Sequence, residues 1–376
     1  MKFCIWMNMP SHHQSAFFKA LSAQKDVDLQ VRYYEKVPEA RKKLGWADDS
    51  YLPSNQKYID SINNIETSLP DWQERTHIVP GFSSPFLKAL LDLAISNDLK
   101  WVHWSERSGV GLAKLLHFNY GLIDMVYPMF LRLKGYKKYS KQVNQSALGC
   151  LAIGELAKRD FARWGINDKK IAFQPYSLDG LAIPKVISIN LKKSDEIIFM
   201  YIGSLEERKG IDVLIAACEK IVSRSQWKLI LVGDDRSNDA YAQQVEQVGL
   251  ADQVEFIGVV QSGKINEYLA QADVFVLPTR FDGWGAVLNE AASLGKPIIS
   301  TDQAGAAYHL IREGETGYMV KAGDADALAK AMQYYVDQPE QIPLQGKKSL
   351  EIFQNFTPEK SAELFVSNIQ KFLVHQ

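Results

Sequence analysis

Short apolar runs alternate with longer helical patterns along most of the chain, and this alternation limits the possible folds more than any other feature. In the second half, the runs are IIFMYIG, KLILVG, VEFIG, VFVLP, PIIS and GYMV, which begin at residues 197, 228, 254, 274, 297 and 317. Runs that are apolar almost throughout are typical of parallel strands covered on both faces by helices. The sequence therefore predicts an α/β protein with a doubly wound parallel sheet.

The same rhythm also occurs earlier in the chain. The runs FCIWMNM, VDLQVRYY, WVHWS and GCLAIG form a first series, and the polar stretch IPKVISINLKKSDE separates it from the second. A chain of 376 residues is longer than one usual core. We therefore expect two Rossmann-like domains facing across a cleft, over residues 1–185 and 186–357, and a last helix over 358–376 that packs back on the first domain.

Composition argues against several classes of function. The 43 Lys and Arg residues balance 44 Asp and Glu, so the net charge of -1 gives no general argument for nucleic acid as a partner. No apolar run is long enough for a membrane-spanning helix or a signal peptide, and a cytoplasmic protein is expected. The three cysteines lack a CxxC spacing, and we find neither a DxD motif at a strand end nor a compact cluster of His and carboxylates. We expect no metal and no cofactor.

The stretch RFDGWGAVLNEAASLGKP, residues 280–297, directly follows the run VFVLP. It combines a glycine-containing loop at the carboxyl end of a predicted strand with the start of a helix. Free backbone N–H groups at a helix start attract anions, and a diphosphate would fit there. The N–H groups expected to bind it belong to Gly285, Ala286, Val287 and Leu288.

Two carboxylates lie on either side of this predicted anion site. Glu290 follows about one and a half turns into the helix and can reach roughly 7 to 8 Å from the phosphates, which suits a pair of ribose hydroxyls. Asp282, in the loop, can meet hydroxyls of the group attached to the far phosphate. The alternative is an acidic surface loop followed by a helix with a solvated Glu290.

Lys209 is the candidate cation for the same phosphates. It lies in YIGSLEERKGIDVLIAA, residues 201–217, where a predicted strand ends at Gly203 and a helix opens near Lys209. An ammonium group there can neutralise a phosphate leaving group as its charge develops. The alternative is a lysine at an exposed helix start, where the helix dipole is mildly unfavourable for a cation.

Five stretches together resemble a known family: GSLEERKGIDVLIAA, LVGD, VEFIG, ADVFVLPTRFDGWGAVLNEAASLGKPIIS and GETGYMV. In this order and spacing they are similar to the retaining group-1 glycosyltransferases of family four, which have the GT-B fold. The resemblance covers the second predicted domain, from about Ile197 to Val336. The first domain resembles the family in layout, most recognisably in GELAKRDFARWGI and QPYSLD.

The resemblance implies a donor site and a reaction. In the family, a pair of glutamates separated by seven residues corresponds to Asp282 and Glu290, which would lie near the donor sugar and bind the nucleotide ribose. The phosphate-binding lysine corresponds to Lys209. The family's usual arginine corresponds to Ser204, so one cation is missing: either Arg208 or a first-domain residue replaces it, or donor affinity is low. The implied donor-binding residues are Ser204, Arg208, Lys209, Gly283, Trp284, Gly285, Ala286, Val287, Leu288 and Glu290.

The family transfers a sugar from a nucleotide-diphosphate sugar with retention at the anomeric carbon and without a metal. The implied acceptor is a saccharide, lipid-linked in the version we favour, for polysaccharide or glycolipid synthesis. Lys209, Asp282 and His103 are the implied catalytic residues. A non-catalytic nucleotide-sugar-binding protein of the same fold is the alternative, because the position of the missing arginine holds Ser204.

Acceptor-side candidates lie in the first domain. His12 and His13 follow the first predicted strand and would bind a phosphate or the acceptor, although a helix start capped by Ser11 explains them equally well. His103 ends another predicted strand, where family members often have a histidine close to the reacting sugar. Glu106 is a further candidate.

His103 also has a structural interpretation. Trp101, His103 and Ser105 share one face of the predicted strand, so His103 can equally be a core histidine.

Basic residues gather in FLRLKGYKKYSK, within a stretch from Met125 to Gly154 that has no acidic residue. Large apolar and aromatic residues are interleaved with them, a composition that suits the interface of an anionic bilayer. We expect peripheral contact with the inner membrane face, and a solvated basic helix face is the alternative. The basic residues are Arg132, Lys134, Lys137, Lys138 and Lys141.

Overall fold

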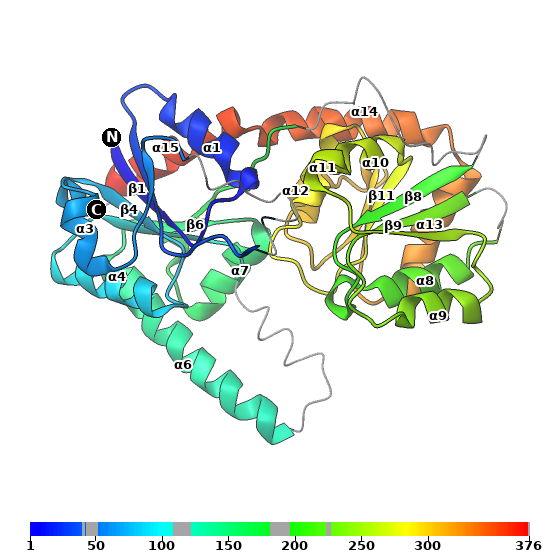
Figure 1. Cartoon of the computed structure of the whole chain (residues 1–376), viewed down its shortest axis with the longest axis horizontal. Helices are drawn as coiled ribbons and strands as arrows, with labels where there is room; N and C mark the ends of the chain where they lie inside the picture. Colours follow the sequence, from blue (N-terminus) through cyan, green and yellow to red (C-terminus); the bar gives the residue numbers. More distant parts are fainter. Residues whose placement is uncertain (40–41, 43–51, 108–121, 181–195, 223–226, 375–376) are drawn as a thin grey trace. The chain divides into compact units, whose positions relative to one another are not determined.

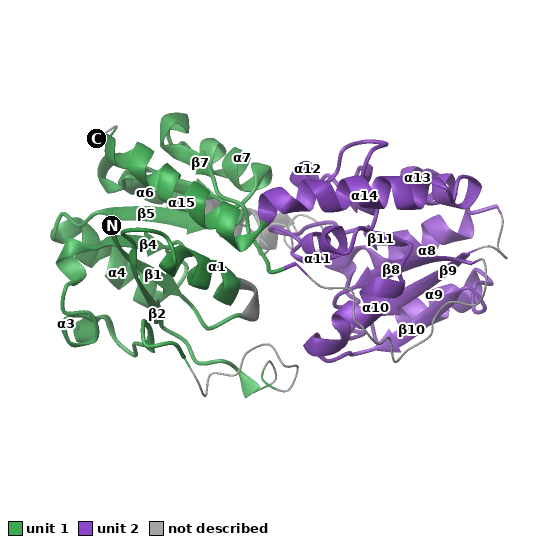
Figure 2. Ribbon diagram, turned by 90° about the horizontal axis from the view of Figure 1, so that it is seen from above, with its two compact units in different colours: residues 1–179, 357–376 green, residues 180–356 purple. Residues whose placement is uncertain are grey.

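The computed structural model describes residues 1–39, 42, 52–107, 122–180, 196–222 and 227–374, without the side chains of 12, 13 and 122–133. It forms two compact units (Figure 2). Unit 1 consists of Met1–Asp179 and Thr357–Gln376, and unit 2 of Gly180–Phe356. The predicted domain boundary at residue 185 lies outside the described residues.

Unit 1 contains a seven-stranded sheet in the order β3-β2-β1-β4-β5-β6-β7, and its neighbouring strands are parallel. Strands β1, β4 and β6 of this sheet are labelled in Figure 1. The strands are β1 (Lys2–Met7), β2 (Asp28–Tyr33), β3 (Gln56–Tyr58), β4 (Thr76–Val79), β5 (Trp101–Ser105), β6 (Gly149–Ala152) and β7 (Ile171–Phe173). The helices are α1 (His12–Ser22), α3 (Ile65–Ser68), α4 (Pro85–Ser96), α6 (Leu122–Ser146), α7 (Glu155–Trp164) and α15 (Pro358–Val374).

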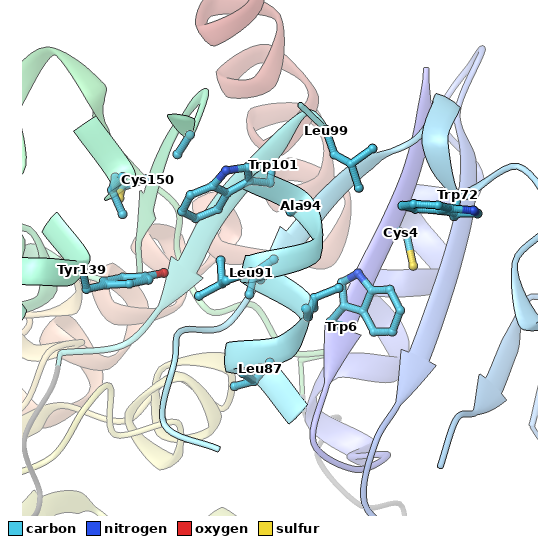
Figure 3. Close-up of a cluster of buried hydrophobic side chains, with 14 of the residues drawn as sticks. Cys4, Trp6, Trp72, Leu87, Leu91, Ala94, Leu99, Trp101, Tyr139 and Cys150 are labelled. Carbon is cyan, nitrogen blue, oxygen red and sulfur yellow. The ribbon is translucent and has the colours of Figure 1, made fainter. Parts of the chain in front are cut away.

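Large apolar side chains from several of these elements form the core of unit 1 (Figure 3). Trp6 of β1, Trp101 of β5 and Tyr139 of α6 are each buried, and Leu87 and Leu91 of α4 belong to the same cluster. The start of helix α4 is fixed locally. The hydroxyl of Ser84 accepts a hydrogen bond from the N–H of Leu87, and Pro85 occupies the first helical position.

The C-terminal helix α15 is part of unit 1. It packs against α1, and Phe365 meets Phe3 of β1 edge to face with ring centroids 5.4 Å apart. The side chain of Gln174 donates to the backbone carbonyl and hydroxyl of Ser361 at 3.0 and 2.9 Å. These buried contacts join α15 to β1 and to the residue that follows β7.

Unit 2 contains a six-stranded parallel sheet in the order β10-β9-β8-β11-β12-β13. Its strands are β8 (Ile197–Ile202), β9 (Trp227–Val232), β10 (Val254–Gly258), β11 (Val274–Leu277), β12 (Ile298–Thr301) and β13 (Gly317–Val320). Its helices are α8 (Ile211–Glu219), α9 (Ala240–Gln247), α10 (Ile265–Gln271), α11 (Val287–Ser293), α12 (Ala307–Leu310), α13 (Ala325–Asp337) and α14 (Gln341–Phe353).

The first six strands of each unit follow the order third, second, first, fourth, fifth and sixth along the chain. This is the Rossmann order, in which the direction of winding reverses between the first and fourth strands. The predicted doubly wound α/β fold is therefore confirmed in both units. In unit 2 the reversal lies between β8 and β11, so the carboxyl ends of these two strands are where a ligand site is expected.

Within the described ranges, no helix is both long and apolar enough to cross a membrane. The same part of the chain has no group of three or more His, Cys, Asp or Glu residues that could hold a metal ion. Cys4, Cys150 and Cys218 are all buried free thiols.

Candidate functional site

The loops after β8 and β11 are joined by backbone hydrogen bonds. The N–H of Arg280 donates to the carbonyl of Arg208 at 2.8 Å, and the hydroxyl of Thr279 donates to the same oxygen at 3.1 Å. Gly210 has a φ of +73°, and a Cβ there would collide with the carbonyl oxygen of Pro278. Only glycine therefore allows the two loops to approach this closely.

Lys209 and Asp282 meet where these loops join. The Lys209 Nζ lies 2.5 Å from the Asp282 Oδ2, and the two side chains are only 13% and 16% exposed. Asp282 is fixed from its backbone, because its N–H donates to the carbonyl of Gln303 at 3.0 Å. Two of the three predicted catalytic residues thus form one partly buried ion pair.

Arg208 is held by other groups. Its guanidinium donates to Glu206 Oε1 through Nη2 at 2.6 Å and to the carbonyl of Phe281 through Nη1 at 2.9 Å. The same Nη1 lies 4.0 Å from Asp282 Oδ1. Arg208, one candidate to replace the cation missing at Ser204, is thus already bound to Glu206 and to the carbonyl of Phe281.

Two residues that the sequence analysis did not single out complete this network. Glu206 accepts from Arg208, and its second carboxylate oxygen lies 3.5 Å from Nη1 of Arg236. Arg236 also donates to Asp234 at 3.1 Å and is 57% exposed. Charged residues in loops look alike in a sequence, so only their position at the ends of β8 and β9 could have suggested them.

The loop after β11 supplies backbone groups. The N–H of Leu288 donates to the carbonyl of Gly285 at 2.9 Å, so the expectation of a free N–H at Leu288 is wrong. Among the described residues, the N–H groups of Gly285, Ala286 and Val287 have no hydrogen-bond acceptor. Three adjacent donors therefore remain for an anion at the beginning of α11.

Gly283 and Trp284 pack inward beside these donors. Trp284 is 1% exposed, its indole N–H donates to Asn289 at 2.8 Å, and its ring stacks on His309. Of Trp284, named above among the implied donor-binding residues, the side chain therefore packs inside unit 2. Gly283 is buried, and its carbonyl oxygen occupies the space where a Cβ on Gly305 would be.

Glu290, on α11, is partly exposed at the surface of unit 2. Burial raises the pKa of Glu290 to about 7. Burial is the only cause of this shift, and no hydrogen bond from the described residues to the carboxyl group contributes to it. A carboxyl group that lacks donors is suited to accept them from a ligand.

In unit 1, the ring of His103 is enclosed at the end of β5. His103 is 2% exposed and lies against Tyr139 and Phe161. The hydroxyl of Ser105 donates to the carbonyl of Glu106 at 3.0 Å and lies 2.8 Å from His103 Nε2, while the hydroxyl of Tyr139 lies 2.8 Å from Nδ1.

Each ring nitrogen of His103 therefore has a hydroxyl partner, and either neutral tautomer satisfies both contacts because a hydroxyl group can donate or accept. Burial lowers the pKa of His103 to about 3. The geometry favours the core histidine that the sequence analysis held as the alternative, and it leaves no nitrogen of His103 free for a substrate.

The remaining candidates of unit 1 have less defined surroundings. Glu106 is partly exposed just after β5. His12 and His13 form the first turn of α1, and their side chains lie outside the described set.

Helix α6 carries the predicted basic segment. Lys134, Lys137, Lys138 and Lys141 are exposed, whereas the side chain of Arg132 is outside the described residues. The interleaved tyrosines point inward, because Tyr139 is buried in the core and Tyr136 stacks on Trp164 with centroids 4.3 Å apart. Of the aromatic rings that we expected at a bilayer, the two described tyrosines therefore pack against unit 1, and the described lysines are exposed beside them.

Residues 183–348 match the family described as glycosyl transferases group 1. N-acetyl-alpha-D-glucosaminyl L-malate synthase of Bacillus anthracis is 30% identical over 166 residues, which cover 44% of this chain and 43% of that protein. The lipopolysaccharide core biosynthesis glycosyltransferase LpsE of Rhizobium meliloti is 30% identical over 156 residues, 40% of this chain and 44% of that protein. The chain thus matches less than half the length of these curated relatives.

Among solved structures, Anabaena HepE in complex with UDP and glucose is similar to the chain with a TM-score of 0.71 and 17% identity. The alignment covers 98% of this chain and 99% of HepE. The likeness therefore extends over both units and supports the predicted GT-B fold.

Proposed function

Because residues 183–348 belong to the glycosyl transferases group 1 family, we propose that the protein is a glycosyltransferase that moves a sugar from a nucleotide-diphosphate sugar to a saccharide. The observation that carries this proposal is the constellation at the carboxyl ends of β8 and β11. Lys209, Asp282, the N–H groups at the start of α11 and the carboxyl group of Glu290 all belong to the loops and helix at this one place in unit 2. HepE, which shares the fold, is described in complex with UDP and glucose.

In the proposed donor complex, each group has a defined task. The ammonium of Lys209 and the N–H groups of Gly285, Ala286 and Val287 bind the diphosphate and stabilise the negative charge that develops as the sugar leaves. Glu290 accepts hydrogen bonds from the two ribose hydroxyls. These bonds favour the ionised form of a carboxyl group whose pKa burial raises to about 7.

We propose that the transfer retains the configuration at the anomeric carbon and needs no metal, as the family resemblance implies. Attack on the front face, with the leaving phosphate helping to deprotonate the acceptor, would leave Asp282 to orient the donor sugar through its hydroxyls. Positive potential for this step comes from Lys209 and the backbone donors.

The proposed acceptor is a lipid-linked saccharide at the inner face of a membrane. LpsE, one of the similar proteins, is named for lipopolysaccharide core biosynthesis. The exposed lysines of α6 suit the surface of an anionic bilayer, each contributing about 1 kcal/mol when near that surface. The two described tyrosines pack against unit 1, so the described part of this surface would act through the charge of its lysines.

A non-catalytic nucleotide-sugar-binding protein is the second candidate, and one observation favours it. Arg208 is tied to Glu206 and to the carbonyl of Phe281, and Ser204 occupies the position of the family's arginine. The donor phosphates would then meet Lys209 as the main side-chain cation.

Calorimetric titration with UDP, GDP, ADP and TDP in EDTA tests the donor site. We expect one nucleotide to bind the wild type, and Glu290→Ala and Lys209→Ala each to weaken it about 10-fold or more, since a lost charged hydrogen bond costs about 1.5 to 3 kcal/mol. Lys220→Ala is the control, because Lys220 forms an exposed pair with Asp326 in the same unit. Binding of none of the four, or equal binding by all variants, would overturn the proposed donor site.

Turnover separates the two candidates. Once the nucleotide is known, its glucose and mannose conjugates are incubated in EDTA with the protein and a membrane extract that supplies acceptors. Sugar incorporation into lipid supports the transferase. Tight binding of the conjugates without incorporation or release of the nucleotide would favour the binding protein.

Flotation with vesicles of phosphatidylglycerol and phosphatidylcholine tests the membrane contact. Binding should fall steeply with salt and in a Lys137→Glu/Lys138→Glu variant. The matched control is Lys347→Glu/Lys348→Glu, which makes the same charge change on α14 of unit 2. Equal flotation of both variants would rule out docking through α6.

A further inference from the structure

The ion pair between Lys209 and Asp282 joins two groups to which the proposed function gives different ligands. Lys209 would bind the diphosphate and Asp282 the hydroxyls of the donor sugar. In the structure the two side chains bind each other at 2.5 Å. Any phosphate that approaches Lys209 must therefore share its ammonium group with a carboxylate.

Backbone contacts on both sides hold this pair together. The N–H of Asp282 donates to the carbonyl of Gln303, and the loop that carries Lys209 is joined to the β11 loop through Arg208 and Arg280. Arg208 is a weak substitute partner for Asp282, because it lies 4.0 Å away and is bound to Glu206. Lys209 is thus the principal partner of the Asp282 carboxylate among the described residues.

From this geometry, and resting on the proposed donor site, we infer that Asp282 is a built-in counter-ion of Lys209 that makes the site prefer the sugar-carrying donor over the nucleoside diphosphate left after transfer. A donor sugar offers hydroxyl groups that donate to the Asp282 carboxylate and replace the ammonium. The nucleoside diphosphate alone has no such groups at this position. It competes with Asp282 for the Lys209 ammonium group and offers the carboxylate no replacement hydrogen bond.

The same competition favours product release. When the sugar has moved to the acceptor, the Asp282 carboxylate loses its hydroxyl donors and again attracts the Lys209 ammonium. The side chains are only 13% and 16% exposed, so water screens this attraction less than it would at a fully exposed pair. Asp282 therefore acts as a specificity residue in addition to orienting the sugar.

Binding of inorganic pyrophosphate to Asp282→Asn tests the inference without knowledge of the nucleotide base. Asparagine keeps the side-chain shape and the backbone bond to Gln303, but it removes the competing charge. We expect the variant to bind pyrophosphate about 10-fold more tightly than the wild type in EDTA by calorimetry, which corresponds to about 1.4 kcal/mol. Asp282→Ala should show the same direction.

The control is Asp212→Asn. It breaks a pair of the same kind, between Asp212 Oδ2 and Arg280 Nη2 at 2.5 Å, in the same unit. This control tests whether a missing carboxylate anywhere near these loops is enough to tighten binding. Equal tightening in Asp212→Asn would overturn the specific role of Asp282.

The second readout is the ratio of dissociation constants for a nucleoside diphosphate and its glucose conjugate. UDP with UDP-glucose and ADP with ADP-glucose serve as probes. The wild type should favour the conjugate, and Asp282→Asn should lower that preference about 10-fold or more, because it binds the nucleotide better and the sugar worse. An unchanged ratio, or weaker pyrophosphate binding by Asp282→Asn, would overturn the inference.

Lys209→Ala distinguishes this failure from failure of the donor site itself. If Lys209→Ala weakens binding of nucleotide and pyrophosphate but Asp282→Asn does not strengthen it, the donor site stands and the counter-ion role is wrong. If Lys209→Ala leaves binding of every probe unchanged, neither proposal holds.

Discussion

The sheets of the two units have the same order in their first six strands. His103 lies at the carboxyl end of β5 in unit 1, and Lys209 and Asp282 follow the carboxyl ends of β8 and β11 in unit 2. At the end of β5, His103 is enclosed by aromatic rings, and both of its nitrogens are hydrogen-bonded. At the ends of β8 and β11, charged side chains remain partly exposed, and within the described residues the carboxyl group of Glu290 has no hydrogen-bond partner.

The difference shows that, in the same fold class, some polar groups stabilise the core and others are left available for a ligand. A buried polar group that is fully hydrogen-bonded helps to define the core, whereas an unsatisfied group costs stability and is available to a ligand. His103 stays neutral because burial lowers its pKa to about 3. Glu290 has a pKa raised to about 7 by burial. The two sites should therefore respond in opposite ways to substitution and to pH.

The largest effect is expected for His103→Ala. This substitution leaves a cavity beside Phe161 and removes the hydrogen-bond partner of the buried Tyr139 hydroxyl, and it should lower the free energy of unfolding by about 3 kcal/mol. Urea unfolding followed by circular dichroism measures the loss in the transition of unit 1.

The pH dependence of wild-type unfolding gives a second check on His103. A histidine whose pKa is lower in the folded state binds fewer protons there than in the unfolded chain between about pH 3 and 6.5. Its contribution to stability is therefore present above pH 6.5 and is lost as the pH falls. If His103→Ala were as stable as the wild type but could not transfer sugar, the core interpretation would fail.

The strands of unit 2, and β1, β2, β5 and β6 of unit 1, could be predicted from the sequence because their apolar runs are nearly continuous, as in IIFMYIG for β8. Strands β3, β4 and β7 were not predicted, because they have only three or four residues each. Helices α13 and α14 were not predicted, although Asp324 caps α13 by accepting from the N–H of Ala327.

The site was predictable where position along a strand determined it, and unpredictable where side-chain direction did. Lys209 and Asp282 were chosen because both follow strand ends, but their ion pair joins residues 73 positions apart in the chain. Trp284 lies in the same loop as Asp282, yet its ring turns inward to Asn289 and His309. Such choices depend on tertiary packing, which periodicity does not report.

An intermediate effect of the opposite sign is expected for Glu290→Gln. Glu290 binds more protons in the folded state than in the unfolded chain between about pH 4.5 and 7, so its stabilising contribution is lost as the pH rises through 7. Glutamine should be neutral for stability below pH 4.5 and raise the free energy of unfolding by about 2 kcal/mol at pH 8, allowing for partial exposure. Parallel melts at pH 4 and pH 8 measure this.

Saturating nucleotide should reverse the order of stability of these two proteins at pH 8, because only the wild-type carboxylate accepts two hydrogen bonds from ribose. A Glu290→Gln variant that is less stable than the wild type at pH 8 without nucleotide would show that the carboxyl group has a structural partner.

The smallest effect on stability is expected for Lys209→Ala. A small effect separates a role of Lys209 in ligand binding from a role in holding the loops together. Ion pairs near the surface contribute about 1 kcal/mol or less, so the free energy of unfolding should change by no more than that amount, and Lys220→Ala should change it by about 0.5 kcal/mol or less. Only Lys209→Ala should also lose nucleotide affinity. A loss of about 3 kcal/mol on Lys209→Ala would mean that the pair with Asp282 holds the loops together, as the bonds to His103 do in unit 1. Little change in the free energy of unfolding with a large loss of nucleotide affinity would mean that the Lys209 ammonium group serves ligand binding and not the stability of unit 2.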